Sequence, residues 1–177
     1  ARIGRHFRQV IADPDEDEDQ QTASAAGLEW LPLWEEAVEP QSALQQLAEA
    51  GFVDAEAAFK RILDLKRGPQ VRAMQRMGRG RLDAFMPRLL VQAVEHEDPD
   101  RVLERVLPLV ERVVRRSAYL VLLSENPGAL QRLIGLCAAS PWISEQIARY
   151  PLLLDELLNE GRLFKPPLAP ELTAELR

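Results

Sequence analysis

The chain has 177 residues, of which 46% are apolar, and its 28 acidic and 22 basic side chains give a formal net charge of −6 at pH 7. Its one cysteine, Cys137, excludes a disulfide framework and any metal site built from several cysteines, and it favours a reducing, cytoplasmic compartment. No apolar run reaches the roughly 18 residues that a membrane span needs, so we predict no membrane partner.

The charge excess comes from one acidic run near the N-terminus. Residues 13–19 hold six carboxylates in seven positions, and removing these six from the 28 acidic residues leaves 22 acidic against 22 basic ones. Such a run is typical of a solvated, disordered segment. We therefore predict an acidic disordered linker over residues 13–27, preceded over residues 1–12 by the end of a helical domain. The missing initiating Met leads us to expect the cut edge of a larger protein.

Helical spacing of apolar residues begins after this linker. Ala58, Ile62 and Leu65 recur at intervals of three or four residues, so they fall on one face of a helix that Asp54 can cap. No segment shows the period of two that marks a half-buried strand. We predict an all-α protein, an irregular multi-helix bundle of about nine helices, whose main helical body is residues 28–160.

Prolines mark the expected starts and bends of the later helices. From Leu82 onward the apolar stripes are denser. Pro87 is expected to kink its helix or split it in two, and Pro108 is expected to bend the next one. Trp142 is predicted to anchor its helix in the core. Helices are expected to begin where a capping residue precedes a proline, at Asp98-Pro99, Asn126-Pro127 and Ser140-Pro141.

Residue patterns for catalysis or metal binding are missing from the chain. Its two histidines, His6 and His96, are ninety positions apart, whereas a metal site needs three or four convergent ligands. Cys137 has apolar neighbours and is expected to be a buried structural thiol. Gly78-Arg79-Gly80 lacks the Gly-Lys-Ser/Thr of a phosphate-binding loop. We therefore assign no catalytic, cofactor-binding or metal-ligating residue.

The segment from Lys66 to Arg88 is the first candidate docking surface. It is rich in arginine, and Gly78 and Gly80 would give it mobility, so it is suited to an anion or an acidic protein partner. The plainer alternative is a solvated face whose arginines pair with carboxylates elsewhere in the bundle. Nucleic acid is not favoured, because Phe85 is the only aromatic residue here and the chain outside the acidic run is neutral. The arginines concerned are Arg72, Arg76, Arg79 and Arg81.

A second candidate surface surrounds Arg112. Arg112, Arg116 and Tyr119 are spaced so that they would share one face of a single helix, with Arg115 beside them. Three guanidinium groups on such a face suit a bidentate grip on the carboxylates of a neighbouring domain. An ordinary row of surface ion pairs, with Glu111 as a local partner, is the alternative.

An ordered series of motifs carries a family resemblance. Residues 115–127 read RRSAYLVLLSENP, residues 138–143 read AASPWI, and residues 150–158 read YPLLLDELL. With residues 47–52 and 80–87 upstream, this series resembles the central helical segment of the bacterial bifunctional glutamine-synthetase adenylyltransferases, over roughly residues 44–158. The motif positions are Arg115, Arg116, Ser117, Tyr119, Glu125, Asn126, Pro127, Ser140, Pro141, Trp142, Pro151, Asp155 and Glu156.

The resemblance implies two nucleotidyltransferase halves joined by a helical middle. One half attaches AMP from ATP to a tyrosine of glutamine synthetase, the other removes it by phosphorolysis, and glutamine and the PII signalling protein decide which activity dominates. Each half holds magnesium through a Gly-Ser-x-x-Asp-x-Asp motif. This chain has no Gly-Ser dipeptide. It is therefore expected to be the middle segment, inactive alone, with residues 161–177 leading into an absent catalytic domain.

Coupling of the two halves is the role that this position implies. The partners would be the adjacent catalytic domains, and the parent enzyme would use ATP and Mg²⁺. Coupling needs two arrangements of the helical body, and the expected moving parts are the Gly78–Gly80 segment and the bends at Pro87 and Pro108. The alternative is a stand-alone helical adaptor that binds an acidic protein partner through its basic segment.

Overall fold

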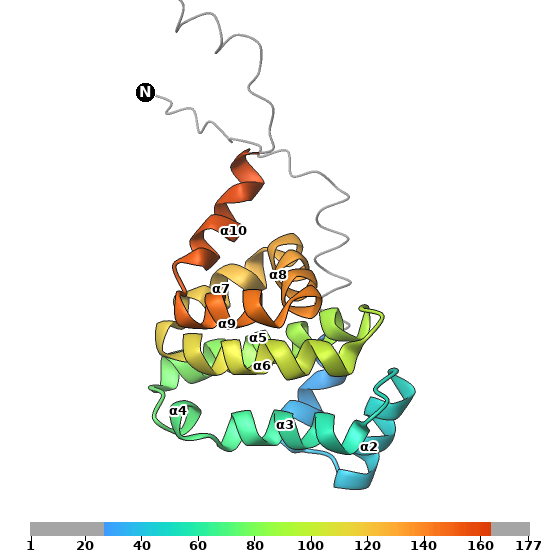
Figure 1. The fold of residues 1–177 in the computed structure, drawn as a ribbon. Helices are drawn as coiled ribbons and strands as arrows, with labels where there is room; N and C mark the ends of the chain where they lie inside the picture. Colours follow the sequence, from blue (N-terminus) through green and yellow to red (C-terminus); the bar gives the residue numbers. More distant parts are fainter. Residues whose placement is uncertain (1–26, 164–177) are drawn as a thin grey trace, which may run out of the picture.

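The computed structural model describes residues 27–163, with side chains as far as residue 158. This part of the chain is helical, contains no strand and stacks its helices in layers (Figure 1), which confirms the predicted all-α, irregular multi-helix bundle. Residues 1–12, the acidic run and residues 164–177 lie outside the described residues, as does His6. Within residues 27–163, no helix is both long and apolar enough to cross a bilayer.

The lower layer in Figure 1 contains the first helices. A helix over residues 27–35 is followed by α2 (Pro40–Glu49), α3 (Ala55–Arg67) and the short α4 (Pro69–Arg72). Helix α3 begins where predicted, because the carboxylate of Asp54 accepts a hydrogen bond from the backbone N–H of Ala57 at 2.9 Å. Gly51, with φ of 103°, makes the left-handed turn after α2.

The middle layer is formed by two long helices, α5 (Arg76–Val94) and α6 (Pro99–Val113). The carboxylate of Asp98 accepts a hydrogen bond from the backbone N–H of Arg101 at 3.0 Å, which confirms the predicted start of α6. Pro87 and Pro108 both lie inside continuous helices, so neither proline splits its helix. A 3₁₀ turn, η1 (Val114–Arg116), leads to the upper layer.

The upper layer consists of α7 (Ala118–Glu125), α8 (Pro127–Ala139), α9 (Pro141–Arg149) and α10 (Leu153–Leu163). The hydroxyl of Ser140 accepts a hydrogen bond from the backbone N–H of Ile143 at 3.4 Å, as expected of a cap. Asn126 precedes α8 as predicted, but its side-chain amide instead donates to the carbonyl of Leu122 at 2.6 Å. Helices α8 and α9 both pack on α6.

One continuous apolar core runs through all three layers, and Trp34, Phe85 and Leu120 are among its largest fully buried side chains. Trp142 does not belong to it: 65% of this residue is exposed, so the predicted core anchor is wrong. Helix α9 buries Ser144 and Ile147 instead. At about 100° per residue, Trp142 lies roughly 200° from Ser144 around the helix and therefore faces solvent.

Candidate docking surfaces

Several motif residues serve the fold itself. The hydroxyl of Tyr119 donates a hydrogen bond to the carboxylate of Asp155 at 3.2 Å and so ties α7 to α10. Burial raises the pKa of Tyr119, and the hydrogen bond to Asp155 raises it further. Pro127 and Pro141 stand at the first positions of α8 and α9. Pro151 precedes α10, and the side chains of Glu125 and Glu156 are exposed.

The Lys66 junction, which comprises Trp34, Glu36, Lys66 and Arg67, joins the first helix to α3. The ammonium of Lys66 donates to the carbonyl of Trp34 at 2.5 Å and lies 5.5 Å from the centroid of the Trp34 ring. Its nitrogen is also 3.4 Å from the carboxylate of Glu36, to which Arg67 donates a further hydrogen bond. The hydrogen bond from Arg67 is the largest cause of a lowered Glu36 pKa, and Lys66 adds to it.

Three arginines of the first candidate surface are also bound within the fold. Arg79 donates to the carboxylate of Asp83 at 3.2 Å. Arg81 donates to the hydroxyl of Ser117 at 3.1 Å, and Arg88 donates to the carbonyl of Ser124 at 2.5 Å. The Arg79 pair lies within α5, whereas Arg81 and Arg88 hold α5 to Ser117, the residue after η1, and to α7.

The Gly78–Gly80 segment is not a flexible elbow, because it lies in the first turns of α5. A Cβ at Gly78 would lie 3.3 Å from the Met74 side chain and 3.6 Å from the hydroxyl of Ser117. The start of α5 therefore lies close to Ser117, the residue after η1.

Four exposed arginines gather at one end of the bundle. Helices α4 and α5 both contact η1, which lies between α6 and α7 at the left of Figure 1. The residues are Arg72 on α4, Arg76 at the start of α5, and Arg115 and Arg116 on η1, here called the arginine patch. Among residues 27–158, no carboxylate forms an ion pair with any of the four. The fold thus joins parts of both candidate surfaces, although the two basic segments are about forty positions apart in sequence.

The predicted helical face of Arg112, Arg116 and Tyr119 does not form. Helix α6 ends at Val113, the next three residues form the 3₁₀ turn, and Tyr119 is a buried residue of α7. A 3₁₀ turn advances about 120° per residue instead of about 100°, so the spacing rule for one α-helix fails across it.

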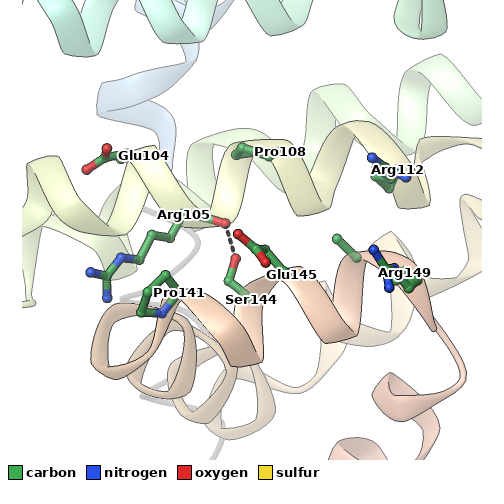
Figure 2. A pocket seen from close by; sticks show the side chains of 9 residues that line it. Glu104, Arg105, Pro108, Arg112, Pro141, Ser144, Glu145 and Arg149 are labelled. Carbon is green, nitrogen blue, oxygen red and sulfur yellow. Dashed lines mark hydrogen bonds between the residues drawn. The ribbon is translucent and has the colours of Figure 1, made fainter.

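Arg112 instead lines a groove between α6 and α9. The groove has a volume of about 600 Å³ and places Arg112 and Arg149 at one end (Figure 2). The hydroxyl of Ser144 donates to the backbone carbonyl of Arg105 at 2.6 Å. The Arg105 side chain points toward the end of α8, where it donates to the carbonyls of Cys137, at 3.2 Å, and Ala138. A cation at this position satisfies carbonyls that lack a helical donor.

Comparison with known proteins then decides the family. A family model described as "Glutamate-ammonia ligase adenylyltransferase" matches residues 130–177. A Pseudomonas aeruginosa protein named "Bifunctional glutamine synthetase adenylyltransferase/adenylyl-removing enzyme" is 72% identical over 178 residues that cover 100% of this chain. The chain belongs to this adenylyltransferase family. Adenylyltransferases of the same name from Pseudomonas putida and Thioalkalivibrio sulfidiphilus are 69% and 46% identical, each over 99% of the chain.

The chain spans 18% of the length of each of these adenylyltransferases. Membership agrees with the resemblance carried by the motif series and does not favour the stand-alone adaptor. Within the described residues, no three side chains of His, Cys, Asp or Glu lie close enough together to hold a metal ion.

The two single titratable groups singled out in the sequence have structural roles. Cys137 is fully buried, and burial raises the pKa of its thiol to about 11, as is typical of an inert thiol. The imidazole Nδ1 of His96 accepts a hydrogen bond from the backbone N–H of Asp98 at 3.1 Å, next to the start of α6.

Sequence reasoning missed the Lys66 junction and the role of Arg105. The sequence shows Lys66 and Arg67 near the end of α3 only as part of a basic segment, and no pattern distinguishes Arg105. A partial signal existed, because basic residues commonly bind the terminal carbonyls of helices. Their partners, Trp34 and Ala138, lie about thirty positions away in the sequence and so could not be identified.

Proposed function

We propose that this chain is the helical middle of a bifunctional glutamine-synthetase adenylyltransferase and that it couples the two catalytic halves. The proposal is carried by the match of the whole chain to a part of enzymes that are named for two opposed activities. The single continuous core supports it, because such a body moves as a unit and can pass a displacement from one end to the other.

The parent enzyme, in this proposal, attaches AMP from ATP to a tyrosine of glutamine synthetase and removes it by phosphorolysis in the cytoplasm. ATP and Mg²⁺ bind in the catalytic halves and not in this chain. Glutamine and the PII protein select the activity by stabilising one arrangement of the helical middle over another. The isolated chain should transfer no AMP, and AMP incorporation into glutamine synthetase by this chain alone would contradict that expectation.

Two surfaces are suited to contact the flanking halves. The arginine patch lies at one end of the bundle, and the groove with Arg112 and Arg149 lies between α6 and α9. Both present guanidinium groups, which bind carboxylates in a bidentate geometry. Coupling then requires that at least one of these contacts differs between the two states of the enzyme.

The test is charge reversal in the full-length enzyme. The double variant Arg112→Glu/Arg116→Glu should change the ratio of adenylylation to deadenylylation and its response to glutamine and PII protein. Lys60→Glu is the control, because Lys60 lies on α3 with 78% of its side chain exposed. If the double variant keeps both activities and both effector responses at the level of this control, the docking role is wrong.

A further inference from the structure

Within the described residues, no carboxylate lies within ion-pair distance of an arginine of the patch. Some other basic side chains, such as Lys60, Lys66 and Arg101, pair with carboxylates there, whereas Arg112 and Arg149 also form no ion pair. The four patch arginines are exposed and have no such pair. Arg115 and Arg116 are also neighbours in sequence. Four like charges at one end of a small body create a positive field that attracts a polyanion.

The opposite charge is present in the same chain. Residues 13–19 carry six carboxylates, and the chain without them is neutral. Several acids of the described part are already engaged, namely Glu36, Asp64, Asp83 and Asp98. The acidic run is therefore the densest source of carboxylates for the patch, and carboxylate is the group that guanidinium binds best.

The acidic run is also within reach. A Cβ at Gly27 would lie 3.7 Å from the Cβ of Pro87, so the chain enters the described body beside α5. Pro87 is eleven residues beyond Arg76 on this helix, a distance of about 17 Å at 1.5 Å per residue. The eight residues from Asp19 to Gly27 span up to about 27 Å when extended. The tether is therefore long enough to bring the acidic run to the start of α5.

We propose that the acidic run, residues 13–19, binds the arginine patch of the same chain. Each exposed ion pair is weak, but the tether keeps the two partners at a high effective concentration and several pairs form together. Salt must weaken the contact, because both partners are exposed to solvent. This inference concerns the chain alone and does not rest on the proposed coupling function.

The test is paramagnetic relaxation in the whole chain. A nitroxide label is attached to a cysteine introduced by Gln20→Cys, while the buried Cys137 remains unlabelled. At low salt we expect the backbone amide signals around Arg76 and Arg115 to lose about half of their intensity or more, because the tether keeps the label close. In about 0.5 M NaCl, where the Debye length is about 4 Å, the signals should recover.

Two variants control this measurement. Arg72→Gln/Arg76→Gln/Arg115→Gln/Arg116→Gln removes the charge of the patch, and substitution of the six acidic residues by Asn or Gln removes the charge of the run. Both should restore the intensities, and the second changes nothing in the described body. The proposal is overturned if the label broadens the amides beside Arg112 and Arg149 instead, if no patch amide is broadened, or if the broadening persists in either variant.

Discussion

The Lys66 junction and the arginine patch are both rich in basic side chains, yet the fold uses them in different ways. At the junction, the ammonium of Lys66 lies against the carbonyl and ring of Trp34 and beside the carboxylate of Glu36. The guanidinium groups of the patch face solvent and have no carboxylate partner in the described part of the chain. The first cluster contributes to folding, and the second is available for binding.

The difference follows from what each cluster lies next to. Lys66 and Arg105 reach the C-terminal ends of two helices, the one over residues 27–35 and α8, where carbonyls lack helical donors. The patch lies at the end of α4, at the start of α5 and on η1, and its side chains donate to no such carbonyl among the described residues. Basic residues therefore stabilise this bundle where they donate hydrogen bonds to the terminal carbonyls of a helix, and a high local number of them is not enough.

The largest expected effect on the free energy of unfolding comes from Trp34, whose ring centroid lies 5.5 Å from the Lys66 ammonium. Trp34→Ala should lower the free energy of unfolding by about 3–5 kcal/mol, because it removes a fully buried aromatic side chain and its hydrogen bond to Asp83. Trp142→Ala is the matched control and should change it by less than about 0.5 kcal/mol, since Trp142 is exposed. Urea unfolding followed by circular dichroism measures both, and equal losses would contradict the assignment of the two tryptophans.

Removal of the Lys66 charge tests the junction directly. Lys66→Met keeps the apolar stem but leaves the Trp34 carbonyl and the Glu36 carboxylate without this donor, so we expect a loss of about 1–3 kcal/mol. Arg76→Met in the patch should cost less than about 0.5 kcal/mol. Equal urea midpoints for the two variants would contradict the conclusion that the Lys66 junction stabilises the fold and the arginine patch does not.

Arg105 extends the comparison to α8. Arg105→Met removes the donor to the carbonyls of Cys137 and Ala138 and should cost about 1–2 kcal/mol in chemical denaturation. Arg149→Met, on the other wall of the same groove, is the control and should stay within about 0.5 kcal/mol of the parent chain. A larger loss for the control would show that the groove, and not the end of α8, needs the charge.

The smallest effect is a pH dependence at Glu36. Its pKa in the folded chain lies below the ordinary value of 4.5, so its ion pairs stabilise the fold above that pH and cease to do so as the pH falls through the lowered pKa. Glu36→Gln should therefore lose less than about 1 kcal/mol near neutral pH, and the difference should shrink in acid. Glu39→Gln is the control, and urea midpoints across the acid range decide whether only Glu36 shows this trend.

Local chemistry made several features predictable from the sequence. The starts of α3, α6 and α9 follow from Asp54, Asp98 and Ser140, because a capping side chain binds the backbone two or three residues ahead. Apolar spacing indicated the all-α class. The motif series indicated the family, since it depends only on the order of residues.

Only the tertiary structure decided which side chains face solvent and which ones bind one another. Trp142 was expected in the core but is exposed, because Ser144 and Ile147 form the buried face of α9. Packing of α4 and α5 against η1 brought the segments of Arg72 and Arg76 to that of Arg115 and Arg116. Caps and helix periods act over a few residues, whereas these outcomes depend on neighbours that are thirty or more positions away, so composition and spacing alone could not determine them.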